Sequence, residues 1–145
     1  MDGQLLIVDG HNALMGLKRF AQALWDNPAD AREQLVDWLS RYQSSSDDAV
    51  VVVFDGKGND RNVYSGDEGE AMVIYASSQE TADAVVEQLA ASQGKKRSVV
   101  VATNDRSVQL SVIDSGAEAL SLEAMEMRVE LLLDSARKNW NVQSG

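Results

Sequence analysis

The sequence predicts an α/β domain of three layers, in which a mostly parallel central sheet of four to five strands is flanked by helices. Two observations support this prediction. Short continuous apolar runs, which suit strands buried on both faces, alternate along the chain with longer segments of helical spacing. The chain of 145 residues also has the size of one ordinary domain, so we expect residues 1–145 to form a single domain.

The first part of the chain predicts two strands separated by two helices. Residues 5–8 are a continuous apolar run, and residues 13–25 and 29–43 have helical composition, with a break at an asparagine-proline pair. Residues 49–54 form a second apolar run. Each run ends in an aspartate followed by a glycine, so the two predicted strands end in the same way.

The middle of the chain predicts a long loop, a third strand and a helix. Residues 56–69 are rich in glycine and charge and read as a mobile loop, unusually long for a compact domain and therefore often functional. Residues 71–76 form the third strand. Ser77 and Glu80 match the capping-box pattern, which predicts a helix that opens there and runs to about Ser92.

The last part predicts a fourth strand, a weaker fifth strand and two helices. Residues 99–102 are apolar and are followed by a short helix to about Ile113. Residues 117–120 are the candidate for the fifth strand. Ser121 caps a final helix whose apolar residues fall on one face.

Acidic residues lie at the carboxyl ends of the predicted strands. Asp9 and Asp55 directly follow the first and second strands, Asp105 lies just beyond the fourth, and Asp83 is near the start of the helix after the third. In such sheets ligands bind outside the carboxyl ends of the strands, and neighbouring strands are only about 4.8 Å apart. We therefore expect Asp9, Asp83 and Asp105 to form a carboxylate cluster whose mutual repulsion requires a cation.

The residue types in the chain select a hard metal ion. There is no cysteine and only one histidine, which excludes disulfides, thiolate catalysis, cysteine-bound zinc and a multi-histidine metal site. Oxygen ligands without sulfur favour Mg²⁺ or Mn²⁺. Magnesium is usually bound by one or two carboxylates together with substrate phosphate oxygens, which points to phosphodiester hydrolysis by a metal-activated water.

The candidate residues also have structural alternatives. Aspartate is favoured at turns and helix N-termini, which would explain Asp9 and Asp105 without a metal, and Asp83 would interact favourably with a helix dipole. Asn12 is a candidate for contacting phosphate, for fixing the loop after the first strand, or for capping the next helix. The residues with predicted supporting roles at the site are Asp55, Glu80 and Thr103.

The charge of the chain gives mixed indications for a nucleic-acid partner. The net charge of −10 argues against binding to phosphate, although a metal reverses the local sign of an acidic site. Five cations fall in segments that follow strands one, two and four, near the predicted carboxylates, and we expect them to contact RNA. These residues are Lys18, Arg19, Lys57, Arg61 and Arg106. The alternative is that they are solvated surface charges.

The N-terminal segment predicts no membrane association. An acidic start leads directly into a short apolar run, without the basic flank and long hydrophobic region of a signal peptide or a membrane span. We therefore expect a cytoplasmic protein.

Four segments resemble motifs of the NYN domain, a branch of the PIN-like ribonucleases. Residues 6–12 are similar to the opening motif, with an aspartate and an asparagine three residues later, and residues 51–56 are similar to the second strand motif. Residues 80–83 resemble the helix-start motif with the next acidic residue, and residues 101–105 resemble the strand that ends in a small hydroxyl residue and an aspartate. The match, over residues 4–120, is closest to the YacP-like NYN proteins, and it implies endoribonuclease activity.

Together these features predict a metal-dependent endoribonuclease in which Asp9, Asp83 and Asp105 hold Mg²⁺ or Mn²⁺. RNA is the expected partner, and the low pI suggests the hypothesis that a ribosome or another protein presents it. The alternative is a noncatalytic RNA- or protein-binding module with the same fold, and a third interpretation is a phosphatase or nucleotide hydrolase. The sequence does not determine the oligomeric state.

Overall fold

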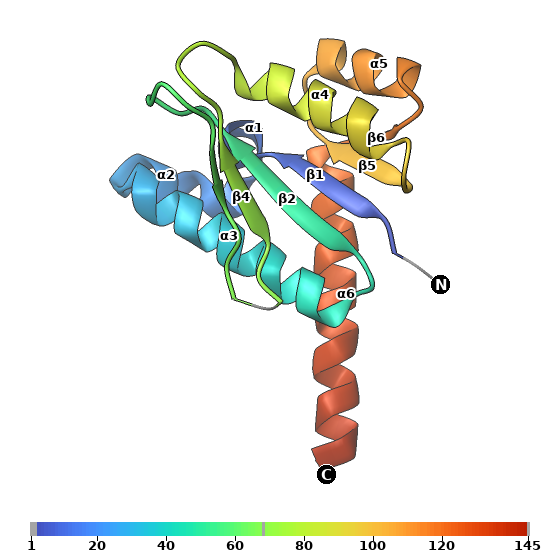
Figure 1. Cartoon of the computed structure of the whole chain (residues 1–145). Coiled ribbons are helices and arrows are strands. Elements are labelled where there is room, and N and C mark those ends of the chain that lie inside the picture. Colours follow the sequence, from blue (N-terminus) through green and yellow to red (C-terminus); the bar gives the residue numbers. More distant parts are fainter. Residues whose placement is uncertain (1–2, 68, 145) are drawn as a thin grey trace.

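A computed structural model describes residues 3–67 and 69–144. Its centre is a six-stranded sheet with the strand order β3-β4-β2-β1-β5-β6 (Figure 1). The strands are β1 (Leu5–Asp9), β2 (Ala49–Phe54), β3 (Asn62–Tyr64), β4 (Met72–Tyr75), β5 (Val99–Ala102) and β6 (Glu118–Leu120). All pairs are parallel except β3 with β4.

Helices follow β1, β4, β5 and β6 and cover both faces of the sheet (Figure 1). After β1 the chain forms α1 (Gly10–Gly16), the short 3₁₀ helix η1 (Lys18–Phe20), α2 (Ala21–Asp26) and α3 (Pro28–Ser45). The later helices are α4 (Ala82–Gln93), α5 (Arg106–Asp114) and α6 (Leu122–Ser144). The predicted three-layer α/β fold is thus confirmed. None of the helices in the described part of the chain combines the length and the apolar character needed to cross a bilayer.

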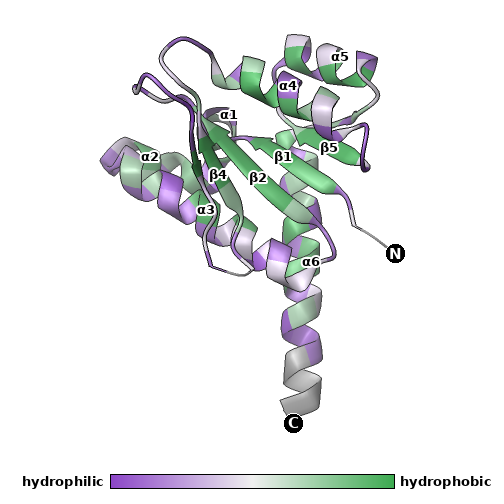
Figure 2. Ribbon diagram, in the orientation of Figure 1, coloured by the Kyte–Doolittle hydropathy of each residue, from purple (hydrophilic) through white to green (hydrophobic). Residues whose placement is uncertain are grey.

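Alternation of side chains along the strands creates two separate cores. In β1, Leu6 and Val8 pack with α1, α3 and α6 on one face, whereas Leu5 and Ile7 pack with α4 and α5 on the other. All five residues of β1 are buried, because the strand is central and flanked by parallel neighbours on both sides. Figure 2 shows β1, β2, β4 and β5 as the most apolar strands and the helices as mixtures of apolar and polar residues.

The number of strands exceeds the predicted four to five, because the segment predicted to be a long mobile loop contains β3. Its three residues are all exposed and pair antiparallel with β4 at the edge of the sheet. An exposed edge strand of this length lacks the alternation of buried and exposed residues that identifies a strand in a sequence. The prediction that residues 56–69 form only a loop was therefore wrong.

The helix boundaries near β1 also differ from the prediction. The structure begins α1 at Gly10, directly after the strand, with Asp9 as the N-cap residue that accepts a hydrogen bond from the backbone N–H of Asn12. Asn12 lies inside the helix and does not cap it. The predicted helix over residues 13–25 is divided at Leu17, which has an extended backbone, into α1, η1 and α2.

The predicted start of α4 at Ser77 was wrong. Thr81 is the N-cap residue, because its hydroxyl accepts the backbone N–H of Ala84. The reciprocal half of the predicted capping box is nevertheless present, since a Glu80 carboxylate oxygen accepts the backbone N–H of Ser77 at 2.9 Å. This bond stabilises a turn before the helix, not the first turn of the helix.

Candidate functional site

Four aspartates from different elements line one cavity of about 310 Å³ at the carboxyl edge of the sheet. Asp9 is the last residue of β1, Asp55 follows β2, Asp83 lies in the first turn of α4, and Asp105 follows β5. The order of the strands explains the convergence, because β2 and β5 flank β1 and all three run in the same direction. The structure therefore brings the predicted carboxylates together.

Asp9 lines this cavity and is only 5% exposed. Burial, and next the negative charge of Asp83, raise the pKa of Asp9 from its ordinary value of 3.8 to about 6. Hydrogen bonds from the Asn12 backbone and the Thr103 hydroxyl act in the opposite direction. The net shift shows that a second negative charge and the loss of water outweigh these two donors.

Thr103 and Asn12 join the ends of β1 and β5. The fully buried Thr103 hydroxyl lies 3.2 Å from an Asp9 carboxylate oxygen and 3.3 Å from the Asn12 side-chain oxygen, and it accepts the backbone N–H of Asp105 at 3.1 Å. Asn12 Oδ1 also accepts the backbone N–H of Asn104 at 2.8 Å. With Oδ1 engaged in this way, the Asn12 amide nitrogen remains as the donor of a side chain that lines the cavity.

Asp105 and Asp55 each use one carboxylate oxygen to cap a helix. Asp105 Oδ1 accepts the backbone N–H of Ser107 at 2.9 Å, together with the Ser107 hydroxyl and the next backbone N–H, and these bonds lower the pKa of Asp105. Asp55 Oδ1 accepts the backbone N–H of Ala82, at the start of α4, at 2.9 Å. The capping alternative is thus realised for Asp105, as it is for Asp9 at the start of α1. In Asp105 and Asp55 the second oxygen makes no described hydrogen bond.

Asp83 is the half-buried member of the cluster on α4. Burial raises the pKa of Asp83, and the negative charge of Asp105 and, more weakly, that of Asp55 act in the same direction. Raised pKa values on two neighbouring carboxylates are typical of sites that bind a cation or a proton.

The donor set fits a hard divalent cation. All four aspartates offer oxygen, and the cavity contains no sulfur from cysteine. Within residues 3–67 and 69–144, no three acidic or histidine side chains are gathered closely enough to enclose one ion. Magnesium does not need such a cage, because it keeps several waters and is commonly bound by one or two carboxylates and substrate phosphates.

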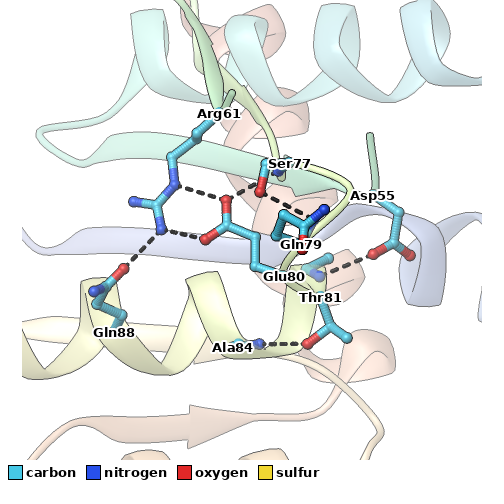
Figure 3. A network of polar contacts seen from close by, with 9 residues as sticks. Asp55, Arg61, Ser77, Gln79, Glu80, Thr81, Ala84 and Gln88 are labelled. Carbon is cyan, nitrogen blue, oxygen red and sulfur yellow. Dashed lines mark hydrogen bonds and ion pairs between the residues drawn. The ribbon is translucent and has the colours of Figure 1, made fainter. Parts of the chain in front are cut away.

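Glu80 does not face the cavity and belongs instead to an ion-paired clamp beside it (Figure 3). Arg61 donates from Nε and Nη2 to the two carboxylate oxygens of Glu80 at 3.1 and 2.8 Å, and from Nη2 to Gln88 of α4 at 2.7 Å. The guanidinium holds the pKa of Glu80 down at about 2. The clamp therefore ties the loop before β3 to the turn that precedes Asp83.

The five cations expected to contact RNA are placed in two different ways. Arg19 is paired with Glu126 at 2.8 Å and Glu130 at 2.6 Å of α6, and its guanidinium lies over the Trp38 ring. Arg61 is held by Glu80, as described above. The other three of the five, Lys18, Lys57 and Arg106, are exposed and have no ion pair within the described residues.

Four further residues line the cavity that the sequence did not assign to the site: His11, Met15, Thr81 and Ala82. His11 and Met15 are four residues apart on α1 and share one exposed face with Asn12. The prediction missed this face because it began the helix at residue 13. With α1 starting at Gly10, helical spacing would have predicted that His11 and Met15 lie beside Asp9.

The parallel sheet, its two helical layers and the aspartates at its carboxyl edge define a domain of the PIN-like nuclease fold. The chain belongs to the YacP-like NYN domain family, whose model matches residues 6–144. It is 29% identical over 132 residues to the uncharacterized protein YacP of Bacillus subtilis (strain 168), a match that covers 88% of this chain and 76% of that protein.

Two solved structures share the fold. The crystal structure of the W164L mutant of Rae1 (YacP) from Bacillus subtilis matches with a TM-score of 0.80 at 27% identity and covers 98% of this chain and 84% of that one. A second crystal structure of Rae1 (YacP) from the same organism matches with a TM-score of 0.75 at 28% identity, over 98% and 81% of the two chains. Membership of the family supports a nuclease-type function that acts on RNA.

Proposed function

We propose that this protein is a metal-dependent endoribonuclease that hydrolyses phosphodiester bonds in RNA. The observation that supports this most directly is the convergence of four aspartates on one small cavity, where burial and mutual repulsion raise the pKa of Asp9 to about 6. A protein that maintains such repulsion without a cation loses stability. A nuclease site gains from it, since the same carboxylates bind the ion that the reaction needs.

Asp9, Asp83 and Asp105 are the proposed ligands of Mg²⁺ or Mn²⁺. When bound, the ion supplies a polarised phosphoryl oxygen and a water of lowered pKa. Asn12 is positioned to donate from its amide nitrogen to a phosphate oxygen, because its own oxygen is engaged by Asn104. Thr103 holds the carboxylate of Asp9 and the turn before Asp105, so it acts as a positioning residue.

The test is cleavage of an unstructured RNA at low salt in Mg²⁺, Mn²⁺ or chelator. We expect cutting that requires a divalent ion and is abolished in Asp83→Asn, whereas Asp114→Asn, an exposed carboxylate at the end of α5, cuts like the wild type. Asp83→Asn is nearly isosteric and leaves the Thr81 cap of α4 in place, so lost cleavage with unchanged melting temperature identifies a functional role.

The same assay distinguishes the noncatalytic alternative. RNA binding without cutting, equal in metal and chelator and unaffected by Asp83→Asn, would show a binding module with the PIN-like fold. Turnover of a generic phosphomonoester with RNA left intact would show a phosphatase. The proposal that a ribosome or another protein presents the RNA to this acidic chain is tested by adding ribosomes: equal cleavage rates with and without them would remove it.

A further inference from the structure

A second, larger hollow of about 790 Å³ lies beside the carboxylate cavity, between α3 and the β3–β4 hairpin. The two are continuous along the chain, because Asp55 lines the carboxylate cavity and the next two residues, Gly56 and Lys57, line the hollow. A volume of this size lies within the range of about 300–1,000 Å³ that is usual for sites that bind small organic groups. We name it the α3–β3 groove.

Aromatic rings run from this groove towards the carboxylates. Tyr64 of β3 and Tyr75 of β4 line the groove and meet edge to face at 5.8 Å, and Tyr75 stacks on Phe54 of β2 at 5.5 Å. Phe54 in turn packs against Gly10, next to Asp9, so closely that a Cβ at Gly10 would lie 2.4 Å from its ring. Tyr64, at the outer end of this row, is 57% exposed and offers a ring to a ligand.

The basic residues of the groove lie at one of its ends. Arg32, near the start of α3, and Lys57, just after β2, both lie at the end nearest the carboxylate edge. Neither forms an ion pair within the described residues. Of the acidic residues that line the groove, Asp37 is paired with Arg41, Glu33 is next to Arg32 on α3, and Glu70 precedes β4 at the far end.

We propose that the α3–β3 groove binds an unpaired nucleotide of the RNA that flanks the phosphate held at the aspartates, with its base against Tyr64 and its phosphate near Lys57 and Arg32. This rests on the proposed function for its position beside the scissile bond. Aromatic rings and cations in one groove are the combination that binds single-stranded nucleic acid. A base can reach the ring only when it is unpaired, so the groove would make the enzyme prefer single-stranded RNA.

The test measures binding of a short fluorescein-labelled, adenosine-rich RNA to the full chain in chelator, so that no cutting occurs. Stacking of a base on an aromatic ring is worth about 1–3 kcal/mol, which corresponds to a loss of about 5- to 150-fold in affinity in Tyr64→Ala. We expect Tyr64→Phe, which keeps the ring, to bind like the wild type. Val63→Ala changes an equally exposed neighbour of the same strand and is the matched control.

Two further readouts keep the proposal testable if affinity changes for other reasons. Photocrosslinking of the same RNA should modify the peptide that contains Tyr64, and a fully paired duplex of the same sequence should compete poorly against the single strand. Equal affinities for wild type and Tyr64→Ala, without a crosslink at Tyr64, would overturn the proposal and favour a protein ligand for this groove.

Failure of this inference is distinguishable from failure of the proposed function. If Tyr64→Ala leaves metal-dependent cutting of single-stranded and paired RNA unchanged, the groove has no role in RNA binding, whereas the proposed nuclease function stands. Conversely, if binding of single-stranded RNA depends on the Tyr64 ring but the protein does not cut RNA, the groove is an RNA-binding site and the proposed nuclease function is wrong.

Discussion

Replacing Asp9 by asparagine should make the metal-free protein more stable at neutral pH than the wild type. Asparagine is about as good an N-cap residue as aspartate, and its side-chain oxygen can still accept the backbone N–H of Asn12. Its amide nitrogen would replace the oxygen that accepts from Thr103, and it can donate to that hydroxyl, which in turn donates to Asn12 Oδ1. The substitution therefore removes the charge and little else. Burial and the charge of Asp83 make the ionised form of Asp9 unfavourable in the folded protein. We therefore expect the uncharged asparagine to increase the free energy of unfolding.

The size of the effect follows from the pKa of Asp9, which rises from 3.8 to about 6 on folding. At about 1.4 kcal/mol per pKa unit, this corresponds to about 3 kcal/mol. The folded state binds the proton more tightly than the unfolded state, so stability falls as the pH rises from about 4 to about 6 and is constant above that. For a chain of this length, about 3 kcal/mol corresponds to a change of about 6–12 °C in melting temperature.

The assay is urea unfolding of wild type and Asp9→Asn in chelator between pH 4 and pH 8. The free energy of unfolding of the wild type should decline relative to the variant by about 3 kcal/mol across this range. Asp114→Asn, an exposed carboxylate, should follow the wild-type curve in parallel. A difference between wild type and Asp9→Asn that does not change with pH would refute the idea that Asp9 is held in a repulsive, dehydrated place.

Three other substitutions test how the site is supported. Glu80→Gln should lower the melting temperature at neutral pH, because Arg61 holds the pKa of Glu80 down at about 2 and the ionised carboxylate stabilises the fold. The difference between wild type and variant should shrink as the pH falls from 4.5 towards 2, since Glu80 of the wild type is then protonated and its contribution to stability is lost. Gly10→Ala should cost about 1–3 kcal/mol in urea unfolding, since the added methyl would lie 2.4 Å from the Phe54 ring. Thr103→Val should cost about 1–3 kcal/mol, because the buried acceptor of a backbone N–H is lost, and should reduce the cleavage rate; a variant with wild-type stability and cleavage would contradict this role.

The central strands and the carboxylate cluster could be predicted from the sequence because local patterns determine them. Residues 5–8 and 99–102 are continuous apolar runs, and the aspartates at or just beyond their ends lie at the carboxyl edge once the strands are parallel. Asp83 was placed correctly in the first turn of a helix, although the cap of that helix is Thr81 and not Ser77.

Features that depend on pairing between distant segments could not be predicted. Arg19 is paired with Glu126, which lies 107 positions away in the sequence, so its position after β1 gave no indication that it would be engaged by α6. The clamp between Arg61 and Glu80 joins two loops without periodicity. The α3–β3 groove is likewise formed by segments that only the folded sheet brings together.

The most direct test of the central claim, that the aspartate cavity is a metal centre, is titration of the protein with Mn²⁺ followed by electron paramagnetic resonance of the free ion. We expect saturable binding in the wild type that is strongly weakened in Asp83→Asn and unchanged in Asp114→Asn, with Mg²⁺ competing for the same site. Absence of saturable binding, or equal binding by wild type and Asp83→Asn, would contradict the claim.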